Sequence, residues 1–492
     1  MFLMISLHDT KIDPREKFIL DSVLSTEDYD VLFLGIGDHH HPLRSSNAIN
    51  LPEKNLSYWD LIRNTLFVIR YSEKIMRPFM LLTITLLPIA FALRVTLSIA
   101  PIIALFIKLQ HRYKKMCKGK ISNSKNTTTI ELASSISLAS AFPKLKSYIV
   151  DSKNLGFLIR LTWNIHFHLI HKNRILLRYV EKNMKRIDVI HANDFDTFIT
   201  ALILQSKFSS KIVYDSQEFF PDSNSVFSRA EKSFYSGIDR KYCHKADVVV
   251  TVTPQLGSHI KRVYDLKRVF IIPNAYPKSN LLIPNKLVIE NTKKKFVFQG
   301  NFSLNRGLEI LISAWKSQDL SKVAELYLVG PNNRHKEKLM NLARSLNIMD
   351  KGVYFPVAVS PEDLVHNLMS YDVGVIPYPP IDNNFRFCCP NKLGQYMAAG
   401  IAVLSNELPF VDSMIELASC GHSYKFNDER SLAEEVVKFC NSESLAVLKV
   451  NSKAFHEKVF NWEKIGERFI LLYEGTNFEI NEKDSGPLTF IV

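Results

Sequence analysis

Short apolar runs of strand length alternate with stretches of helix length along most of this 492-residue chain. In the first part of the chain these runs cover residues 1–7, 29–35, 187–192, 211–215, 246–252 and 268–274. Helices are expected after the first run, up to about residue 25, and over residues 196–205. Repeated strand, helix, strand units favour a parallel sheet, so the first part of the chain predicts a β/α domain.

The same alternation restarts after a polar stretch near residues 277–294. Strands are expected at residues 296–300, 325–330, 353–355, 373–377 and 401–404, and helices from residue 307, over residues 334–346 and over residues 391–399. The pattern predicts an α/β protein with two facing Rossmann-like, doubly wound parallel-sheet domains, residues 1–276 and 277–455. Residues 456–492 are expected to form a helix that packs back on the first domain, and then a tail. Ligands should bind at the carboxyl ends of the strands, in the cleft between the domains.

A long insertion, about residues 45–185, interrupts the first domain and contains an apolar run at residues 79–107. Arg94 near its middle would cost roughly 2.5–3.5 kcal/mol at the centre of a bilayer, and each half of the run is shorter than the roughly 20 residues that a span needs. A single crossing would also separate strands of one sheet. A re-entrant or interface-lying helical hairpin is therefore favoured, and a hairpin buried in a core is the alternative.

The net charge is +13, and the position of the basic residues along the chain indicates the partner that they bind. Basic residues gather around the apolar run, within residues 77–120, where they favour an anionic membrane surface. Nucleic acid is the weaker interpretation, because no recognition module accompanies the charge. No signal peptide is visible, and the six cysteines include no C-x-x-C pair, so a cytoplasmic protein that is peripheral or monotopic at the inner membrane face is expected.

Two helix starts in the second domain have the features of a phosphate site. Gly300 ends a strand and Arg306 and Gly307 open the next helix, so an anion could meet free backbone N–H groups and one guanidinium. Asn391 and Lys392 likewise stand at a helix start, after Pro390. The alternatives are a plain strand-to-helix turn and an ordinary capped helix.

In the first domain, polar residues follow three predicted strands. His191 and Asp194 are expected to point into the cleft, where a histidine can carry a proton, although a structural histidine is the alternative. Gln217 and Glu218 end the next strand. The loop after the first strand supplies a mixed set of charges that suits a sugar or lipid phosphate acceptor, with a solvated loop as the alternative: His8, Asp9, Asp13 and Arg15. Residues 39–41 are three consecutive histidines, which we interpret as surface residues because no metal-binding spacing accompanies them.

Four motifs occur in order: residues 189–194 (VIHAND), 213–221 (VYDSQEFFP), 299–307 (QGNFSLNRG) and 390–400 (PNKLGQYMAAG). Together they resemble the family-4 glycosyltransferases of the GT-B fold. The likeness covers the N-terminal unit, residues 187–276 and the second domain to about residue 473, but not the insertion. It implies a retaining, metal-independent glycosyltransferase that needs no cofactor. Such an enzyme moves a sugar from a nucleotide diphosphate sugar to a lipid-linked glycan acceptor in polysaccharide biosynthesis.

The resemblance also implies roles for individual residues. The donor-binding set is Gly300, Asn301, Arg306, Gly330, Tyr378, Asn391, Lys392 and Gln395, and the catalytic set is Glu218, Gln217, His191 and Asp194. In the family a basic residue at Arg306 grips the pyrophosphate, and a second one often stands at Asn301. The family's two glutamates, eight residues apart, are Phe387 and Gln395 here. Gln395 can still bind a ribose diol, but Phe387 replaces a carboxylate, so sugar contacts would come from elsewhere, such as backbone groups around residues 383–384.

Four departures from the family pattern favour an alternative function. Gln217 stands where family members frequently carry a histidine near the reacting sugar, and it can donate a hydrogen bond but cannot exchange a proton. Together with Phe387, Gln395 and Asn301 it suggests a catalytically silent GT-B scaffold or partner subunit of a glycan-synthesis complex. A nucleotide-sugar epimerase would share the fold, but it would not explain the apolar and basic insertion.

Overall fold

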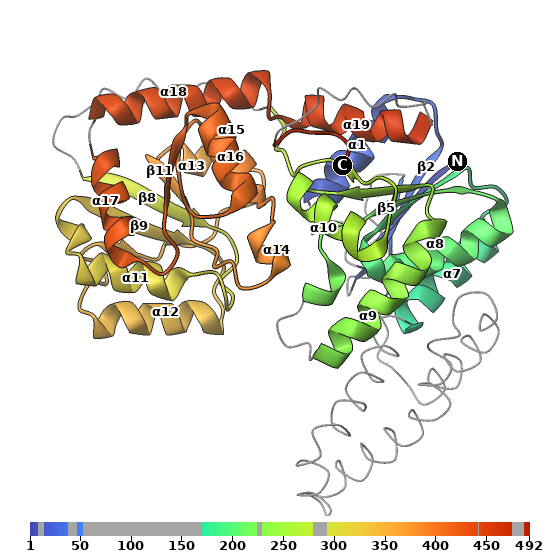
Figure 1. Cartoon of the computed structure of the whole chain (residues 1–492), viewed down its shortest axis with the longest axis horizontal. Coiled ribbons are helices and arrows are strands. Elements are labelled where there is room, and N and C mark those ends of the chain that lie inside the picture. Colours follow the sequence, from blue (N-terminus) through green and yellow to red (C-terminus); the bar gives the residue numbers. More distant parts are fainter. Residues whose placement is uncertain are drawn as a thin grey trace, which may run out of the picture. The chain divides into compact units, whose positions relative to one another are not determined.

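The computed structural model describes residues 1–7, 14–37, 47–52, 170–223, 229–278, 293–440, 442–474 and 487–492. The chain divides into two compact units, one made of residues 52–184 and one made of the rest. Of the smaller unit, which holds most of the predicted insertion, the structure describes α7 (Lys172–Asn183). The larger unit contains two β/α lobes (Figure 1).

The first lobe is built on a seven-stranded sheet with the order β3-β2-β1-β4-β5-β6-β7. Its strands are β1 (Phe2–Ile5), β2 (Val31–Gly37), β3 (Ala48–Pro52), β4 (Val189–Asn193), β5 (Lys211–Asp215), β6 (Val248–Thr251) and β7 (Phe270–Ile271). Every predicted strand of this lobe is confirmed, whereas β3 lies in the range that we had assigned to the insertion. β1 pairs in parallel with both β2 and β4, with Phe2 opposite Val31 and Val189.

The helices of the first lobe cover both faces of its sheet. They are α1 (Pro14–Ser25), α8 (Asp194–Phe208), α9 (Arg229–Tyr242) and α10 (Pro254–Tyr264). Right-handed crossovers run in opposite directions from β1 to β2 and from β4 to β5, so α1 and α8 lie on opposite faces. This explains why every residue of β1 and β4 is buried and why both strands appear in the sequence as continuous apolar runs.

The second lobe has a six-stranded parallel sheet with the order β10-β9-β8-β11-β12-β13. Its strands are β8 (Lys294–Gln299), β9 (Ala324–Val329), β10 (Val353–Tyr354), β11 (Val373–Ile376), β12 (Ala402–Asn406) and β13 (Gly421–Tyr424). The helices are α11 (Leu308–Ser317), α12 (Arg334–Ser345), α13 (Leu364–Leu368), α14 (Asn383–Arg386), α15 (Asn391–Ala399), α16 (Pro409–Ala418) and α17 (Glu429–Phe439). Figure 1 shows α11 and α12 on one side of this sheet and α13, α15 and α16 on the other. The predicted strands and helices of this domain are confirmed.

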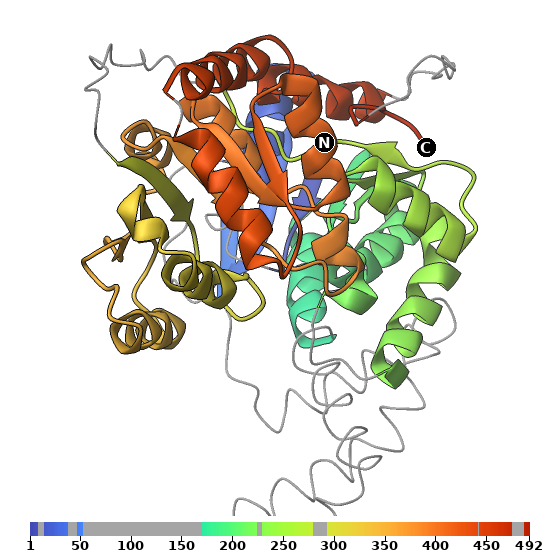
Figure 2. The ribbon, with the colours of Figure 1, turned by 60° about the vertical axis from the view of Figure 1, so that its left-hand side comes forward.

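Two C-terminal helices follow the second lobe. α18 (Ser442–Lys458) packs on α15, and α19 (Trp462–Glu474) packs on α1 of the first lobe (Figures 1 and 2). The indole N–H of Trp462 lies within hydrogen-bond distance of the Phe18 carbonyl, at 3.0 Å, and of the Ser22 hydroxyl, at 2.9 Å. The chain thus returns to the lobe in which it began.

The end of the expected tail pairs with the edge of the first sheet through an isolated β-bridge. Residues 490–492 pair with the β7 segment in the antiparallel direction, through Phe490 to Ile271 at 2.7 Å and Val492 to Val269 at 3.0 Å. Covering an edge in this way blocks pairing with another chain. Within the part of the chain that the structure describes, no helix combines the length and apolar character needed to cross a membrane. The apolar run at residues 79–107 lies outside the described residues.

Candidate functional site

A cavity of about 380 Å³ lies where the carboxyl ends of strands from both lobes meet. It is lined by Gln217, Glu218, Asp222, Ser223, Val252, Leu256, Asn274, Arg306, Tyr378, Asn384, Phe385, Cys388, Cys389, Pro390, Asn391 and Lys392. The volume is within the range typical of small-molecule sites. In the second lobe the lining comes from the loops after β8 and β11, which flank the point where the strand order reverses.

Two cations lie on aromatic faces at this cavity. The guanidinium of Arg306 lies 4.6 Å from the ring centroid of Tyr378 and 5.5 Å from that of Phe385. The ammonium of Lys392 donates to the Tyr378 hydroxyl at 2.8 Å. Within the described ranges, neither cation has a carboxylate within ion-pair distance. The part of the cavity wall formed by Arg306 and Lys392 is therefore positive and has charge available for an anionic ligand.

Glycines bring the Arg306 loop close to its neighbours. Gly300 has φ of 147°, and a Cβ there would lie 2.6 Å from the Lys392 ammonium. Gly307 has φ of 73°, and its Cβ would lie 1.8 Å from the Pro377 carbonyl oxygen. A side chain at Gly307 would push the Arg306 loop away from Pro377, and one at Gly300 would displace the Lys392 ammonium, so the two glycines allow this close packing beside Lys392.

The N-terminus of α15 faces the same cavity, since Pro390, Asn391 and Lys392 all line it. No side chain caps this helix, and Pro390 carries no N–H. In the described structure the backbone N–H groups of Asn391 and Lys392 have no acceptor. Uncapped N–H groups and the positive end of the helix dipole favour an anion at this point.

Residues 383–389 of the second lobe bind directly to the first lobe. The side-chain amide of Asn384 accepts from the Phe219 N–H at 2.7 Å and donates to the Phe219 carbonyl at 3.1 Å. The Thr253 hydroxyl donates to the Phe387 carbonyl at 2.7 Å. The Asn274 side chain donates to the Cys389 carbonyl at 2.9 Å. The segment in which we expected backbone contacts to a sugar is therefore used to join the lobes.

Gln217 and Glu218 line the cavity from the first lobe, and their loop is fixed by Asp194. The carboxylate of Asp194 accepts from the Gln217 N–H at 3.2 Å, and Ser216 donates to the Glu218 carbonyl at 2.9 Å. Asp194 itself has φ of 59° and is not part of the lining. It holds the Gln217 backbone and does not line the cavity.

His191 does not face the cleft, and this expectation was wrong. Its side chain is completely buried on the α19 side of the sheet, where Nδ1 lies 2.8 Å from the Tyr473 hydroxyl. Its Nε2 lies 3.1 Å from Asn193 Oδ1 and 3.7 Å from an oxygen of Asp215. The alternative of a structural histidine accounts for these contacts.

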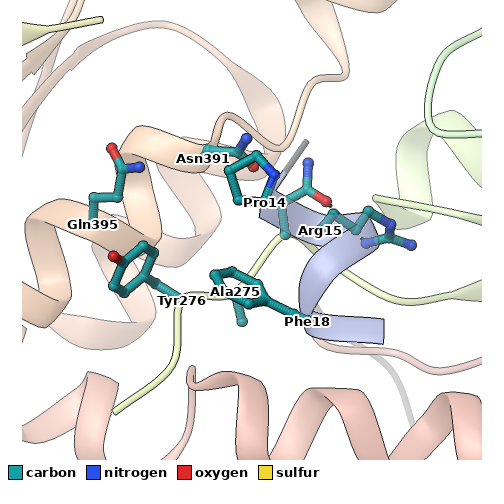
Figure 3. Close-up of a pocket in the computed structure, with 8 residues that line it drawn as sticks. Pro14, Arg15, Phe18, Ala275, Tyr276, Asn391 and Gln395 are labelled. Carbon is teal, nitrogen blue, oxygen red and sulfur yellow. Dashed lines mark hydrogen bonds between the residues drawn. The ribbon is translucent and has the colours of Figure 1, made fainter. Parts of the chain in front are cut away.

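Arg15 is also buried, in the first turn of α1, and is not a residue of an open acceptor loop. Its guanidinium binds both carboxylate oxygens of Asp215, at 2.9 and 3.0 Å, and donates to the Ile272 carbonyl and to Asn274 Oδ1. Figure 3 shows the guanidinium turned away from Gln395 and Asn391. Burial alone would raise the pKa of Asp215, but the charge of Arg15 and the hydrogen bonds from His191 and Arg15 more than offset it and hold the pKa below its usual value. His8, Asp9 and Asp13 lie outside the described residues.

The predicted donor-binding residues divide into two groups. Arg306, Tyr378, Asn391 and Lys392 line the large cavity. Gly300, Asn301 and Gly330 do not line it, and Gly330 is packed so tightly that a Cβ would lie 2.2 Å from the Gly300 carbonyl oxygen. The Asn301 carbonyl oxygen Oδ1 accepts from Asn333 at 3.1 Å.

Gln395, the fourth donor residue outside the large cavity, lies in a small neighbouring one. It is 7% exposed and lines this space with Arg15 and Tyr276 (Figure 3). Asn391 lines both cavities. The ribose contact expected of Gln395 is therefore not provided by the lining of the large cavity.

Asp222, Asn274, Cys388 and Cys389 also line the cavity, although no sequence pattern pointed to them. Asp222 directly follows the quoted motif that ends at Pro221, so position alone could have indicated it. Burial raises the pKa of the Cys388 and Cys389 thiols to about 12, so both are protonated at neutral pH. In the described residues, no group of three or more His, Cys, Asp or Glu side chains could hold a metal ion.

Two family models match the chain. The Glycosyltransferase Family 4 model matches residues 145–279, and the Glycosyl transferases group 1 model matches residues 293–442. Together they span more than half of the 492 residues. No curated protein matches the chain in sequence.

Solved structures resemble the chain in fold. Sucrose-phosphate synthase from Thermosynechococcus elongatus has a TM-score of 0.61 at 14% identity, over 96% of this chain and 98% of its own. A glycosyltransferase from Rickettsia africae has a TM-score of 0.57 at 10% identity, over 96% and 97%. Anabaena HepE in complex with UDP and glucose has a TM-score of 0.50 at 14% identity, over 63% and 82%. With two parallel-sheet lobes and both family models matched, the chain belongs to the family-4-type glycosyltransferases of the GT-B fold.

Proposed function

We propose that the large cavity binds a nucleotide diphosphate sugar, whose sugar the enzyme transfers to a lipid-linked glycan at the cytoplasmic face of a membrane. One observation carries the donor part of this proposal. Arg306, Lys392 and the uncapped N-terminus of α15 line the same cavity, and neither cation is neutralised by a carboxylate in the described residues. A diphosphate has the charge and the acceptor oxygens that such a wall recognises. HepE, which has a similar fold, was solved with UDP and glucose.

The same residues suggest a metal-independent mechanism. When the bond from the sugar C1 to the diphosphate oxygen breaks, the electron pair stays on the diphosphate. Arg306, Lys392 and the α15 amides are placed to stabilise that charge, which is the contribution a metal ion makes elsewhere. The acceptor oxygen bonds to C1, and its proton passes to the leaving phosphate oxygen. Attack from the side of the leaving group retains the anomeric configuration.

Gln217 and Glu218 border this reaction from the first lobe. The amide of Gln217 can donate to a sugar hydroxyl or to a phosphate oxygen, and it need not exchange a proton if the leaving phosphate takes the proton. The side chain of Glu218 is exposed, and its carboxylate can accept a hydrogen bond from a hydroxyl of the glycan that receives the sugar. Positioning and preorganised charges then supply most of the rate acceleration.

A second candidate function is a catalytically silent scaffold within a glycan-synthesis complex. The observation that favours it is the use of residues 383–389 to join the lobes, with Phe387 where the family has a carboxylate. Release of nucleoside diphosphate from a panel of nucleotide sugars, with a lipid-linked acceptor present or absent, separates the two. We expect acceptor-dependent release that EDTA does not abolish. If no member of the panel gives release while the protein still associates with other transferases, the scaffold function is correct.

The membrane part of the proposal rests on the sequence of the insertion. The apolar run at residues 79–107 and the basic residues within 77–120 match an interfacial hairpin on an anionic surface, each basic residue contributing about 1 kcal/mol. We predict that deletion of residues 79–120 abolishes sedimentation with vesicles that contain anionic lipid but leaves nucleotide binding intact. Equal sedimentation of the deletion variant would contradict the membrane assignment, and vesicles of neutral lipid serve as the control.

A further inference from the structure

Asp222 brings a carboxylate to the cavity from the first lobe. It ends a short 3-10 helix, η5 (Phe220–Asp222), that follows β5, and its side chain is 11% exposed. One carboxylate oxygen accepts from the Lys232 ammonium at 2.6 Å, and the other accepts from the Asn383 side chain at 2.8 Å. Each oxygen keeps a further acceptor position, because a carboxylate oxygen has two lone pairs.

Few other carboxylates of the described residues line or border the cavity. Among the described lining residues, the only acidic ones are Asp222 and Glu218. The Glu218 side chain is exposed, and the Asp222 carboxylate is nearly buried, with a hydrogen bond to each of its two oxygens. The nearby Asp382 does not line the cavity, and it is committed to the N-terminus of α14, where it accepts from the Phe385 N–H at 2.9 Å. Burial and its two hydrogen bonds therefore make Asp222 a preorganised carboxylate of the site.

We propose that Asp222 recognises hydroxyl groups of the donor sugar, and that Asn383 and Lys232 orient it for that purpose. This inference rests on the proposed binding of a nucleotide diphosphate sugar. A fixed carboxylate accepts hydrogen bonds from sugar hydroxyls, and charge-assisted bonds of this kind are the stronger ones. Arg306 and Lys392 would then bind the diphosphate half of the donor, and Asp222 would bind its sugar half.

The contact to Asn383 adds a dependence on the arrangement of the lobes. Asp222 belongs to the first lobe and Asn383 begins α14 of the second. The neighbouring Asn384 grips the Phe219 backbone, one residue before η5, through two hydrogen bonds. Asp222 is thus fully oriented only while α14 is docked on this segment. Sugar recognition would then require docking, whereas diphosphate binding by the second lobe alone would not.

The test compares sugar recognition with diphosphate binding in the full-length protein. Calorimetry measures the Kd of UDP, ADP and GDP, and of their glucose, galactose, mannose and N-acetylglucosamine conjugates. Deoxy versions of the tightest conjugate then show which hydroxyl the wild-type protein requires. The variants are Asp222→Asn, Asn383→Ser and, as the matched control, Asp319→Asn, whose carboxylate is 65% exposed. Asn383→Ser keeps the carboxylate of Asp222 and removes only its link to the second lobe.

We expect the wild-type protein and the Asp319→Asn control to lose about 10- to 100-fold in affinity when the required hydroxyl is absent. In Asp222→Asn, the affinities for the full and the deoxy conjugate should differ by no more than about 2-fold, and in Asn383→Ser by an intermediate factor. All variants should bind the nucleoside diphosphate with equal affinity. Unchanged discrimination in Asp222→Asn, for every deoxy conjugate, would overturn the role of Asp222 and leave the proposed donor intact. If the wild-type protein binds no conjugate and no nucleoside diphosphate, the proposed function itself fails.

Discussion

Replacing Arg306 with alanine is expected to lower kcat/KM for sugar transfer by about 100- to 1000-fold, the loss typical of removing one group that stabilises developing charge. The guanidinium lies on the Tyr378 and Phe385 rings at the wall of the cavity, and no carboxylate among the described residues neutralises it. Charge on the leaving diphosphate grows as its bond to the sugar breaks. Arg306 therefore interacts more strongly with the transition state than with the bound donor, and kcat should fall more than KM rises.

Two further variants make this prediction specific. Arg306→Lys keeps the charge but loses the planar fork that matches phosphate oxygens, so it should recover only part of the activity. Arg430→Ala is the control, since its side chain is 85% exposed in a pair with Glu434 on α17, and it should retain full activity. An Arg306→Ala enzyme as active as the Arg430→Ala enzyme would show that the leaving group is stabilised elsewhere.

Replacing Arg15 with methionine is expected to lower the free energy of unfolding by about 3–5 kcal/mol, because it leaves the Asp215 carboxylate buried without its partner. Arg15 and Asp215 are 2% and 0% exposed, and two hydrogen bonds join them. The same guanidinium also donates to the Ile272 carbonyl and Asn274, so the variant leaves these acceptors unsatisfied as well. The loss in the free energy of unfolding is measured by urea-induced unfolding of the wild-type protein and the variant.

The pH dependence of this loss follows from the direction of the pKa shift. In the wild-type protein the pKa of Asp215 is lowered, so the stability it contributes is present above its unfolded pKa and disappears as the pH falls through its folded pKa. In Arg15→Met the buried carboxyl has lost its cation and should take up a proton more readily. The difference between wild type and variant is therefore expected to be largest near neutral pH and to shrink toward acid.

A surface pair provides the control for the Arg15 variant. Lys322 and Asp319 form an ion pair at 3.0 Å with side chains 76% and 65% exposed. Exposed pairs contribute little, so Lys322→Met should change the free energy of unfolding by less than about 1 kcal/mol. The double variant Arg15→Met with Asp215→Leu should recover part of the loss, because no unpaired buried charge remains at this position. A loss in Arg15→Met as small as that in Lys322→Met would contradict the buried network.

The sheets could be predicted from the sequence because strands covered on both faces are continuous apolar runs. β1 and β4 are examples, with all their residues buried. β3 and the paired segment at residues 490–492 escaped prediction for a shared reason. Both are short, and each is defined by pairing with a neighbour, not by its own periodicity.

The positions of site residues were predicted well where local backbone geometry fixes them. They were predicted poorly where elements distant in the sequence determine whether a side chain is buried. Arg306 and Lys392 follow from glycine and proline signals at helix starts, which are local. His191 and Arg15 were misplaced because the groups that bury them, Tyr473 and Asp215, lie 282 and 200 residues away in the sequence. A polar residue near a strand end looks the same whether a later helix covers it or leaves it open.

Binding of nucleoside diphosphates tests the central claim most directly. UDP, ADP and GDP are titrated into the wild-type protein and into Arg306→Ala while thermal unfolding is recorded. We predict that at least one of them stabilises the wild-type protein, by about 2.7 kcal/mol at 100 times its Kd, and that Arg306→Ala needs a far higher concentration for the same effect. Stabilisation by none of the three nucleotides, or equal stabilisation of both proteins, would contradict a diphosphate site built on Arg306.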